Sequence, residues 1–242
     1  MRRSVAEMIV RDPEKYAHHD RVFLNNPVVM QGMGLAPLVV LATTGKNALM
    51  LAVSVVLLLM PSRMLACLLS RAFPLRDERP AKEELEKKLL PRGLIYSGSA
   101  AVVYLAVYPI LNALFGVDLL ALGIYLPMLV VEPMLIYRFG RVQETMHKAV
   151  SKGLRITLGY VLLLLLLGCV REWMALGTVF GLPLLSRPVL PMAGMPAGGF
   201  IVLGILCAVW RALAQHRKNY LKTEARNTVA VHHQKEANRE HE

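Results

Sequence analysis

The sequence predicts an all-α polytopic membrane protein of about six transmembrane helices. Hydrophobic side chains make up 55% of the 242 residues, charged residues only 19%, and the mean hydropathy is +0.45. This composition differs from that of a soluble domain, and several windows approach or reach the roughly 20 apolar residues that a spanning helix needs. The windows are expected to be helical because open strands cannot satisfy their backbone polar groups in lipid.

Six apolar windows divide the chain. They cover residues 27–44, 48–69, 93–115, 119–137, 156–170 and 198–213. We expect residues 1–26 to form a cytoplasmic segment, residues 27–214 to form one membrane domain, and residues 215–242 to form a polar, disordered tail. The first segment has no apolar core, so we do not expect it to be a cleavable signal peptide.

Basic residues gather in alternate connections between the windows. Those after the second and fourth windows are Arg71, Arg76, Arg79, Lys82, Lys87, Lys88, Arg92, Arg138, Arg141, Lys148, Lys152 and Arg155. The other connections carry only Lys46, Arg171 and Arg187. Because basic loops stay in the cytoplasm, both termini are predicted to be cytoplasmic. The formal net charge of +11 therefore reflects membrane topology, and no nucleic acid partner is expected.

The first and fourth windows are interrupted by Gly or Pro. Gly34 and Pro37 interrupt the first, and Pro127 and Pro133 interrupt the fourth. Proline removes a backbone hydrogen bond from a helix, and an ordinary proline kink explains either window alone. Interruptions at corresponding positions of two halves instead indicate an inverted repeat with a midplane site between half-helices. The paired breaks therefore predict two inverted repeats of three helices each.

Glu132 is the one carboxylate deep in an apolar window, where an unpaired charge is costly. Two interpretations stay open: a proton or cation site at a half-helix junction, or a protonated side chain that caps backbone groups beside Pro133. The pair Arg171 and Glu172 follows the fifth window and is interpreted as a structural tether for the long connection after it. Cys67, Cys169 and Cys207 lack metal-ligand spacing and are expected to be buried thiols.

Five stretches carry a resemblance to a known family. They are AsnAsnProValValMetGlnGlyMetGlyLeuAlaPro from Asn25, LeuGlyIleTyrLeuPro from Leu122, LeuGlyCysValArgGluTrp from Leu167, GlyThrValPheGly from Gly177 and ProAlaGlyGlyPheIleValLeuGly from Pro196. They resemble the membrane subunits of the Rnf and Na+-translocating NADH:quinone reductase (Nqr) complexes, in particular the RnfE and NqrD branch. The resemblance implies six helices in two inverted three-helix repeats in the bacterial inner membrane. It also implies a homologous membrane subunit and other Rnf/Nqr-type subunits as partners.

The resemblance further implies an iron–sulfur centre of the [2Fe-2S] type, held by one half-helix cysteine from each repeat, in electron transport coupled to Na+ or H+ movement. The positions that match these cysteines are Ala36 and Pro133. Neither residue ligates iron, because thiolates hold such clusters. We therefore expect this chain to bind no cofactor and no metal at the family positions.

The leading functional hypothesis is an integral-membrane subunit of an Rnf/Nqr-type ion-translocating electron transport complex, degenerate at the iron–sulfur site. It would be a non-catalytic subunit of an oxidoreductase that acts as a translocase. The alternative is a free-standing transporter or channel with the inverted-repeat fold, in which Glu132 is the coupling residue. A purely structural or assembly role is the third possibility.

Overall fold

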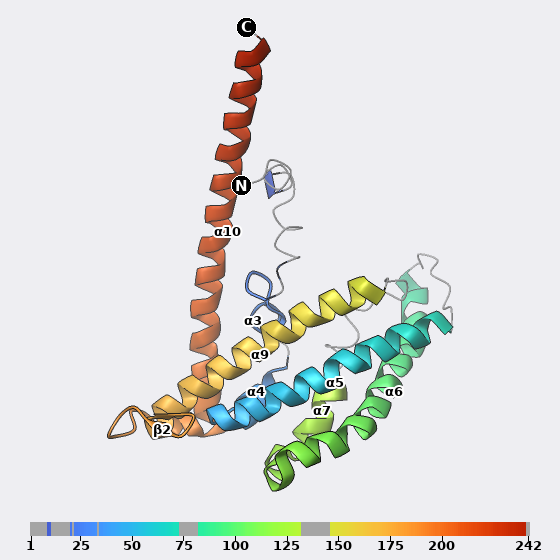
Figure 1. Cartoon of the computed structure of the whole chain (residues 1–242), viewed down its shortest axis with the longest axis vertical. Coiled ribbons are helices and arrows are strands. Elements are labelled where there is room, and N and C mark those ends of the chain that lie inside the picture. The colour runs from blue at the N-terminus through green and yellow to red at the C-terminus, as the bar shows by residue number, and fades with distance from the viewer. Residues whose placement is uncertain are drawn as a thin grey trace.

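The computed structural model describes residues 9–10, 20, 22–32, 34–72, 82–131 and 146–240. The α-helices of this part of the chain are α3 (Pro27–Gln31), α4 (Leu35–Leu41), α5 (Gly45–Ala72), α6 (Lys82–Phe115), α7 (Tyr125–Val131), α9 (Met146–Leu176) and α10 (Pro196–Glu240). Two 3-10 helices, η1 (Gly116–Leu122) and η2 (Pro191–Gly194), and one antiparallel pair of two-residue strands, β1 (Thr178–Val179) and β2 (Leu182–Pro183), complete the described elements. The all-α class is confirmed, apart from this small hairpin (Figure 1).

Four described helices are long and apolar enough to cross a membrane. These candidate spans are Gly45–Leu69, Ser97–Leu122, Gly153–Leu176 and Pro196–His232. They correspond to the second, third, fifth and sixth apolar windows. The first window instead contains α3 and α4, of 5 and 7 residues, and the described part of the fourth contains α7, of 7 residues. Each is much shorter than the roughly 20 residues of a continuous spanning helix.

The core lies between α5 and α9, which cross the centre of the molecule side by side (Figure 1). Their backbones approach closely at Gly168, where an added Cβ atom would lie 2.5 Å from the Cβ of Ala48 and 3.0 Å from the carbonyl oxygen of Thr44. Leu51 on α5 and Leu163 on α9 are fully buried. A small residue at a helix interface is the usual means by which membrane helices pack tightly.

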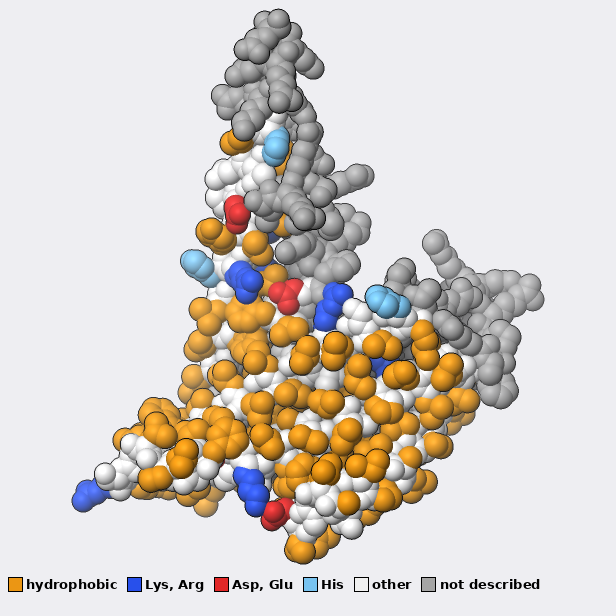
Figure 2. All heavy atoms as spheres, in the orientation of Figure 1, with side chains coloured by type: hydrophobic (Ala, Val, Ile, Leu, Met, Phe, Trp, Pro, Cys, Tyr) orange, Lys and Arg blue, Asp and Glu red, His pale blue; other side chains and the backbone are white. Residues whose placement is uncertain are grey.

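Much of the outer face is hydrophobic. On α6, the side chains of Val102, Leu105, Ile110 and Leu114 are all exposed. Figure 2 shows hydrophobic side chains covering most of the visible face of the helical body. Such a surface suits a bilayer, whose acyl chains are as apolar as leucine.

Helix α10 differs from the prediction of a disordered tail over residues 215–242. It continues as a single helix of 45 residues to Glu240 and extends well beyond the other helices (Figure 1). The sequence from Ile205 to Glu240 contains no Gly or Pro and is rich in Ala, Arg, Lys, Gln and Glu, which favour helix. High helix propensity is therefore the physical reason for the difference.

The segment before α3 is attached to α10. The indole Nε1 of Trp210 donates to the carbonyl oxygen of Phe23 at 3.0 Å, and the two rings lie 5.1 Å apart. The guanidinium carbon of Arg217 lies 5.5 Å from the centre of the Phe23 ring. These contacts hold the chain in place directly before the first broken segment.

Candidate functional site

The first broken segment begins with a capped short helix. Asn26 is completely buried, and its side-chain oxygen accepts hydrogen bonds from the N–H groups of Val28 (3.0 Å) and Val29 (3.4 Å). Asn is a favoured N-cap and Pro27 a favoured first helical residue. The Asn26 amide also donates to the carbonyl oxygen of Gly159 at 2.8 Å. One side chain therefore starts α3 and attaches it to α9.

The chain changes direction between α3 and α4 at two glycines. Gly32 and Gly34 have φ values of 68° and 70°, which favour glycine. The Tyr160 hydroxyl donates to the carbonyl oxygen of Gly34 at 3.1 Å, and a Cβ atom on Gly34 would lie 2.5 Å from the Tyr160 ring. Pro37 is the third residue of α4, where the first turn has no need of its N–H. The interruption thus lies at the glycines, and α9 fixes it.

The fourth window shows a related arrangement. Gly123, with a φ of 47°, precedes α7, and Pro127 is the third residue of that helix. Pro127 therefore occupies in α7 the position that Pro37 occupies in α4. Glu132 and Pro133, the candidate ion site and the matching family position, lie outside the described residues.

Arg171, near the end of α9, is the largest fully buried side chain of the described residues. Its Nε donates to Ala193 (2.9 Å), its Nη1 to Val39 (2.6 Å) and Ala42 (3.0 Å), and its Nη2 to Gly194 (3.1 Å) and Met195 (3.2 Å), in every case to a backbone carbonyl oxygen. A guanidinium has five N–H donors, so all of them are used. One cation therefore joins α9 to the end of α4 and to the segment before α10.

Glu172, the next residue, is 3% exposed, and its carboxylate contacts hydrogen-bond donors rather than carbonyl oxygens. One carboxylate oxygen accepts from the N–H of Gly45 at 2.6 Å. The other accepts from the Thr178 hydroxyl at 2.9 Å and from the N–H of Gly181 at 2.8 Å. The carboxylate therefore joins α9 to the first residue of α5 and to the β1–β2 hairpin.

The chain turns a corner between the end of α4 at Leu41 and the start of α5 at Gly45. The charges of Arg171 and Glu172 are opposite in sign to the dipoles of the two helix ends that meet there. The carbonyl oxygens of Val39 and Ala42 lie at the C-terminal end of α4, where the helix dipole is negative, and Arg171 is the cation there. The N–H of Gly45 lies at the positive N-terminal end of α5, and Glu172 is the anion there. The sequence predicts that the pair tethers the connection after α9. In the structure it also fixes the corner between α4 and α5.

The residues present do not fit the iron–sulfur centre that the resemblance implies. Ala36 is half-buried in the first turn of α4 and offers only a methyl group. Cys67, Cys169 and Cys207 lie on α5, α9 and α10, outside the short helices α4 and α7. Within the described residues, no group of three His, Cys, Asp or Glu side chains could hold a metal ion.

Sequence reasoning missed two buried side chains of this site. Asn26 had a usable signal, because Asn before Pro at the start of an apolar run is an N-cap pattern. Tyr160 had none, since its bond to Gly34 joins residues 126 positions apart and depends on how α9 packs.

Comparisons with known proteins identify relatives of this chain that share one name. Three curated relatives each bear the name of the E subunit of an ion-translocating oxidoreductase complex. The relative from Shewanella oneidensis is 31% identical over 203 residues, which are 76% of this chain and 81% of the relative. The relative from Shewanella putrefaciens is 29% identical over 213 residues, 81% of this chain and 86% of its own. The relative from Shewanella loihica is 29% identical over 202 residues, 76% of this chain and 81% of its own.

The family pattern described as "Rnf-Nqr subunit, membrane protein" matches residues 16–207. This range contains both broken segments, the Arg171–Glu172 corner and the first three of the four candidate spans, and it includes the start of the fourth. The chain is a multi-pass membrane protein that belongs to the Rnf-Nqr family of membrane subunits.

Proposed function

We propose that this chain is a membrane subunit of an ion-translocating oxidoreductase complex of the Rnf/Nqr type. The match of the family pattern to residues 16–207 carries the proposal, supported by relatives that are named as a subunit of such a complex. The chain aligns with more than four fifths of the length of these relatives. Its partners are then the other subunits of the complex, including a homologous membrane subunit.

In this proposal the membrane domain has six spans in two inverted three-helix repeats. The first and fourth spans are the broken ones: the first contains α3 and α4, and the described part of the fourth contains α7. The similar positions of Pro37 in α4 and Pro127 in α7 support a repeat, as does the glycine with a positive φ before each helix. The distribution of basic residues supports cytoplasmic termini. A bacterial inner-membrane location follows from membership of such a complex.

The subunit acts without iron–sulfur ligation at the family positions. The side chain of Ala36 has no atom that could bind iron, and Pro133 has none either. Its role is then to pack the complex together or to line the ion path. Metal analysis of the purified chain tests this: no stoichiometric iron is expected, and iron that disappears on replacing Cys67, Cys169 and Cys207 by Ala would overturn it.

Native co-purification tests complex membership. The chain is isolated from its own membranes in mild detergent, and the associated proteins are identified by mass spectrometry. Recovery with flavin- and iron–sulfur-containing proteins is the expected result. Recovery alone, or only with copies of itself, would contradict the proposal and favour the free-standing transporter.

Glu132 is the candidate for the ion path, because a carboxylate in an apolar window requires a partner, a proton or a function. In the isolated complex, Glu132→Gln is expected to lower ion flux while the complex remains assembled. Asp118→Asn is the matched control, since Asp118 is 58% exposed at the surface. Equal flux in the two variants across pH would remove Glu132 from the ion path.

A further inference from the structure

The connection between α9 and α10, residues 177–195, has the composition of a membrane segment rather than of an aqueous loop. It contains a single charged residue, Arg187, and no acid. Its large apolar side chains are between 49% and 68% exposed at Phe180, Leu182, Leu184, Val189, Met192 and Met195. Exposed apolar patches of this kind mark contact with a partner or with a membrane.

This connection is ordered despite its exposure. Glu172 binds Thr178 and Gly181, and the N–H groups of Leu184 and Leu185 both donate to the carbonyl oxygen of Gly177 at 2.9 Å. Farther along, the N–H of Leu190 donates to Met174 at 2.8 Å, and the Arg171 guanidinium binds the carbonyl oxygens at its end. The apolar side chains are therefore presented outward by a fixed backbone.

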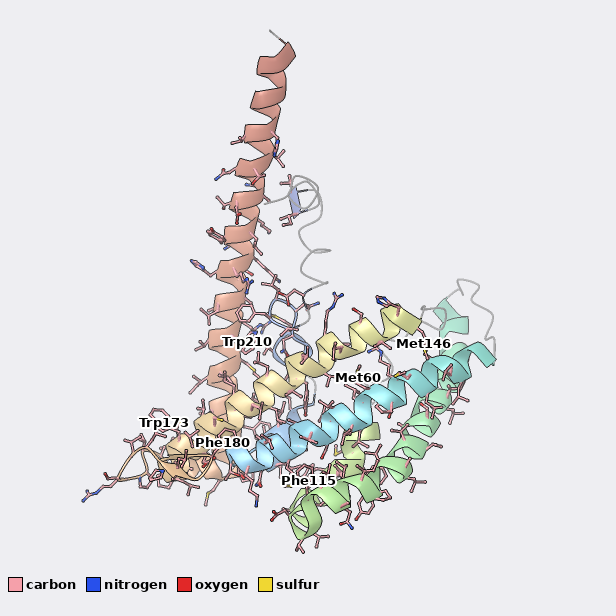
Figure 3. All side chains as sticks on the ribbon, in the orientation of Figure 1. Met60, Phe115, Met146, Trp173, Phe180 and Trp210 are labelled. Atoms are coloured by element: carbon pink, nitrogen blue, oxygen red, sulfur yellow. The ribbon has the colours of Figure 1, made fainter. Side chains whose placement is uncertain are left out.

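The position of the connection points to lipid. It begins directly after the candidate span Gly153–Leu176 and ends where α10 starts at Pro196, so both of its ends lie at a membrane boundary. Trp173, on the last turn of α9, is 39% exposed, and Trp gathers at the headgroup level of bilayers. Figure 3 shows Trp173 and Phe180 at the same end of α9. In Figure 1 a loop of this connection, next to β2, projects sideways from the helices at this end.

We propose that residues 177–195 form an interfacial segment that inserts its apolar side chains into the acyl-chain boundary of the bilayer, with Arg187 at the lipid phosphates. A basic side chain next to leucines and an aromatic residue is the pattern of interfacial anchors. The absence of acidic residues from the segment keeps Arg187 available for phosphate. Hydrogen bonds join residues 177–195 to Glu172 and Arg171, so the anchored segment also holds the corner between α4 and α5 in position.

Quenching of a single tryptophan by brominated lipid tests the proposal. Leu184→Trp is made in a chain in which Trp173 and Trp210 are replaced by Phe, and the chain is reconstituted in phosphatidylcholine vesicles with or without bromine on the acyl chains. Asn227→Trp in the same background is the matched control, because Asn227 is exposed on the α10 extension beyond the family match. Both variants must elute as the parent chain does.

The Leu184→Trp reporter is expected to lose most of its emission in brominated vesicles and little with aqueous iodide. The Asn227→Trp reporter is expected to show the reverse. Quenching of the Leu184→Trp reporter by iodide alone would place the segment in water and overturn the proposal. Protection from both quenchers would mean that protein covers the segment, which would also overturn it.

Arg187→Glu, added to the Leu184→Trp chain, tests the role of the cation separately. In vesicles that contain anionic lipid, this reversal is expected to reduce quenching by brominated lipid and to shift the emission to longer wavelength. Unchanged quenching and emission would exclude phosphate contact at Arg187.

Discussion

Two pairs of charged residues meet near the start of α5, and they differ in burial. Arg171 and Glu172 are 0% and 3% exposed, and each binds helix ends and loop backbone. Lys46 and Asp118 form a direct ion pair at 2.8 Å, but their side chains are 71% and 58% exposed. Arg171 and Glu172 stabilise the corner between α4 and α5, because backbone polar groups left without partners in the interior are costly. The exposed Lys46–Asp118 ion pair stabilises it less, because water screens the attraction.

The largest effect is expected from Arg171→Met. The substitution leaves five carbonyl oxygens without their donor, and we expect a loss of about 3–5 kcal/mol or failure to fold. Thermal unfolding in mild detergent, followed by circular dichroism, measures it. Arg211→Met is the control, since Arg211 is exposed on α10. Equal midpoints for the two variants would show that the carbonyl contacts of Arg171 do not stabilise the fold.

Glu172→Gln is expected to have the next largest effect. The Gln amide keeps the shape of the carboxylate, but an NH2 group replaces one of the two oxygens. This NH2 group cannot accept the hydrogen bonds that the replaced oxygen accepts in the native chain. We expect a loss of ~2–3 kcal/mol, because donors left unpaired in the interior lose their hydrogen bonds. The same thermal unfolding measurement applies, with Asp118→Asn as the exposed control. A midpoint within error of the control would contradict a role for Glu172 in fixing the corner.

A smaller loss is expected from Gly199→Ala. A Cβ atom at this position would lie 2.8 Å from the guanidinium carbon of Arg171, so the guanidinium must move away from its acceptors. We expect destabilisation of about 1–2 kcal/mol from this overpacking. Gly204→Ala on the same helix is the matched control, because an added Cβ there meets nothing within 4 Å. Destabilisation of both variants alike would point to a general effect of α10 and not to Arg171.

Much of this fold could be predicted from the sequence, because the length of an apolar window is a local property. The candidate spans on α5, α6, α9 and α10 each correspond to such a window. The interruption at Gly34 was visible for the same reason, since glycine adopts a left-handed conformation more readily than other residues wherever it lies.

The contacts of the corner could not be predicted in the same way. The acceptors of Arg171 are backbone carbonyl groups, which carry no sequence signature, and Val39 lies 132 positions away. An Arg-Glu pair at the end of an apolar window indicates a tether, but only the packing of α9 against α4 and α5 determines what it binds. The helical α10 extension was missed because its polar composition is also typical of disorder, although its helix propensity is high.

The smallest effect is expected from Lys46→Ala. This substitution removes the ion pair with Asp118 that links the start of α5 to η1, yet both side chains are mostly exposed. Exposed pairs contribute at most about 1 kcal/mol and less at high salt, so the loss should be below that value and should shrink as salt is added. The double variant with Asp118→Ala should be no less stable than Lys46→Ala alone. A large loss of stability that does not change with salt would mean that the Lys46–Asp118 pair is shielded from water. Burial would then not explain why Arg171 and Glu172 contribute more to stability than Lys46 and Asp118 do.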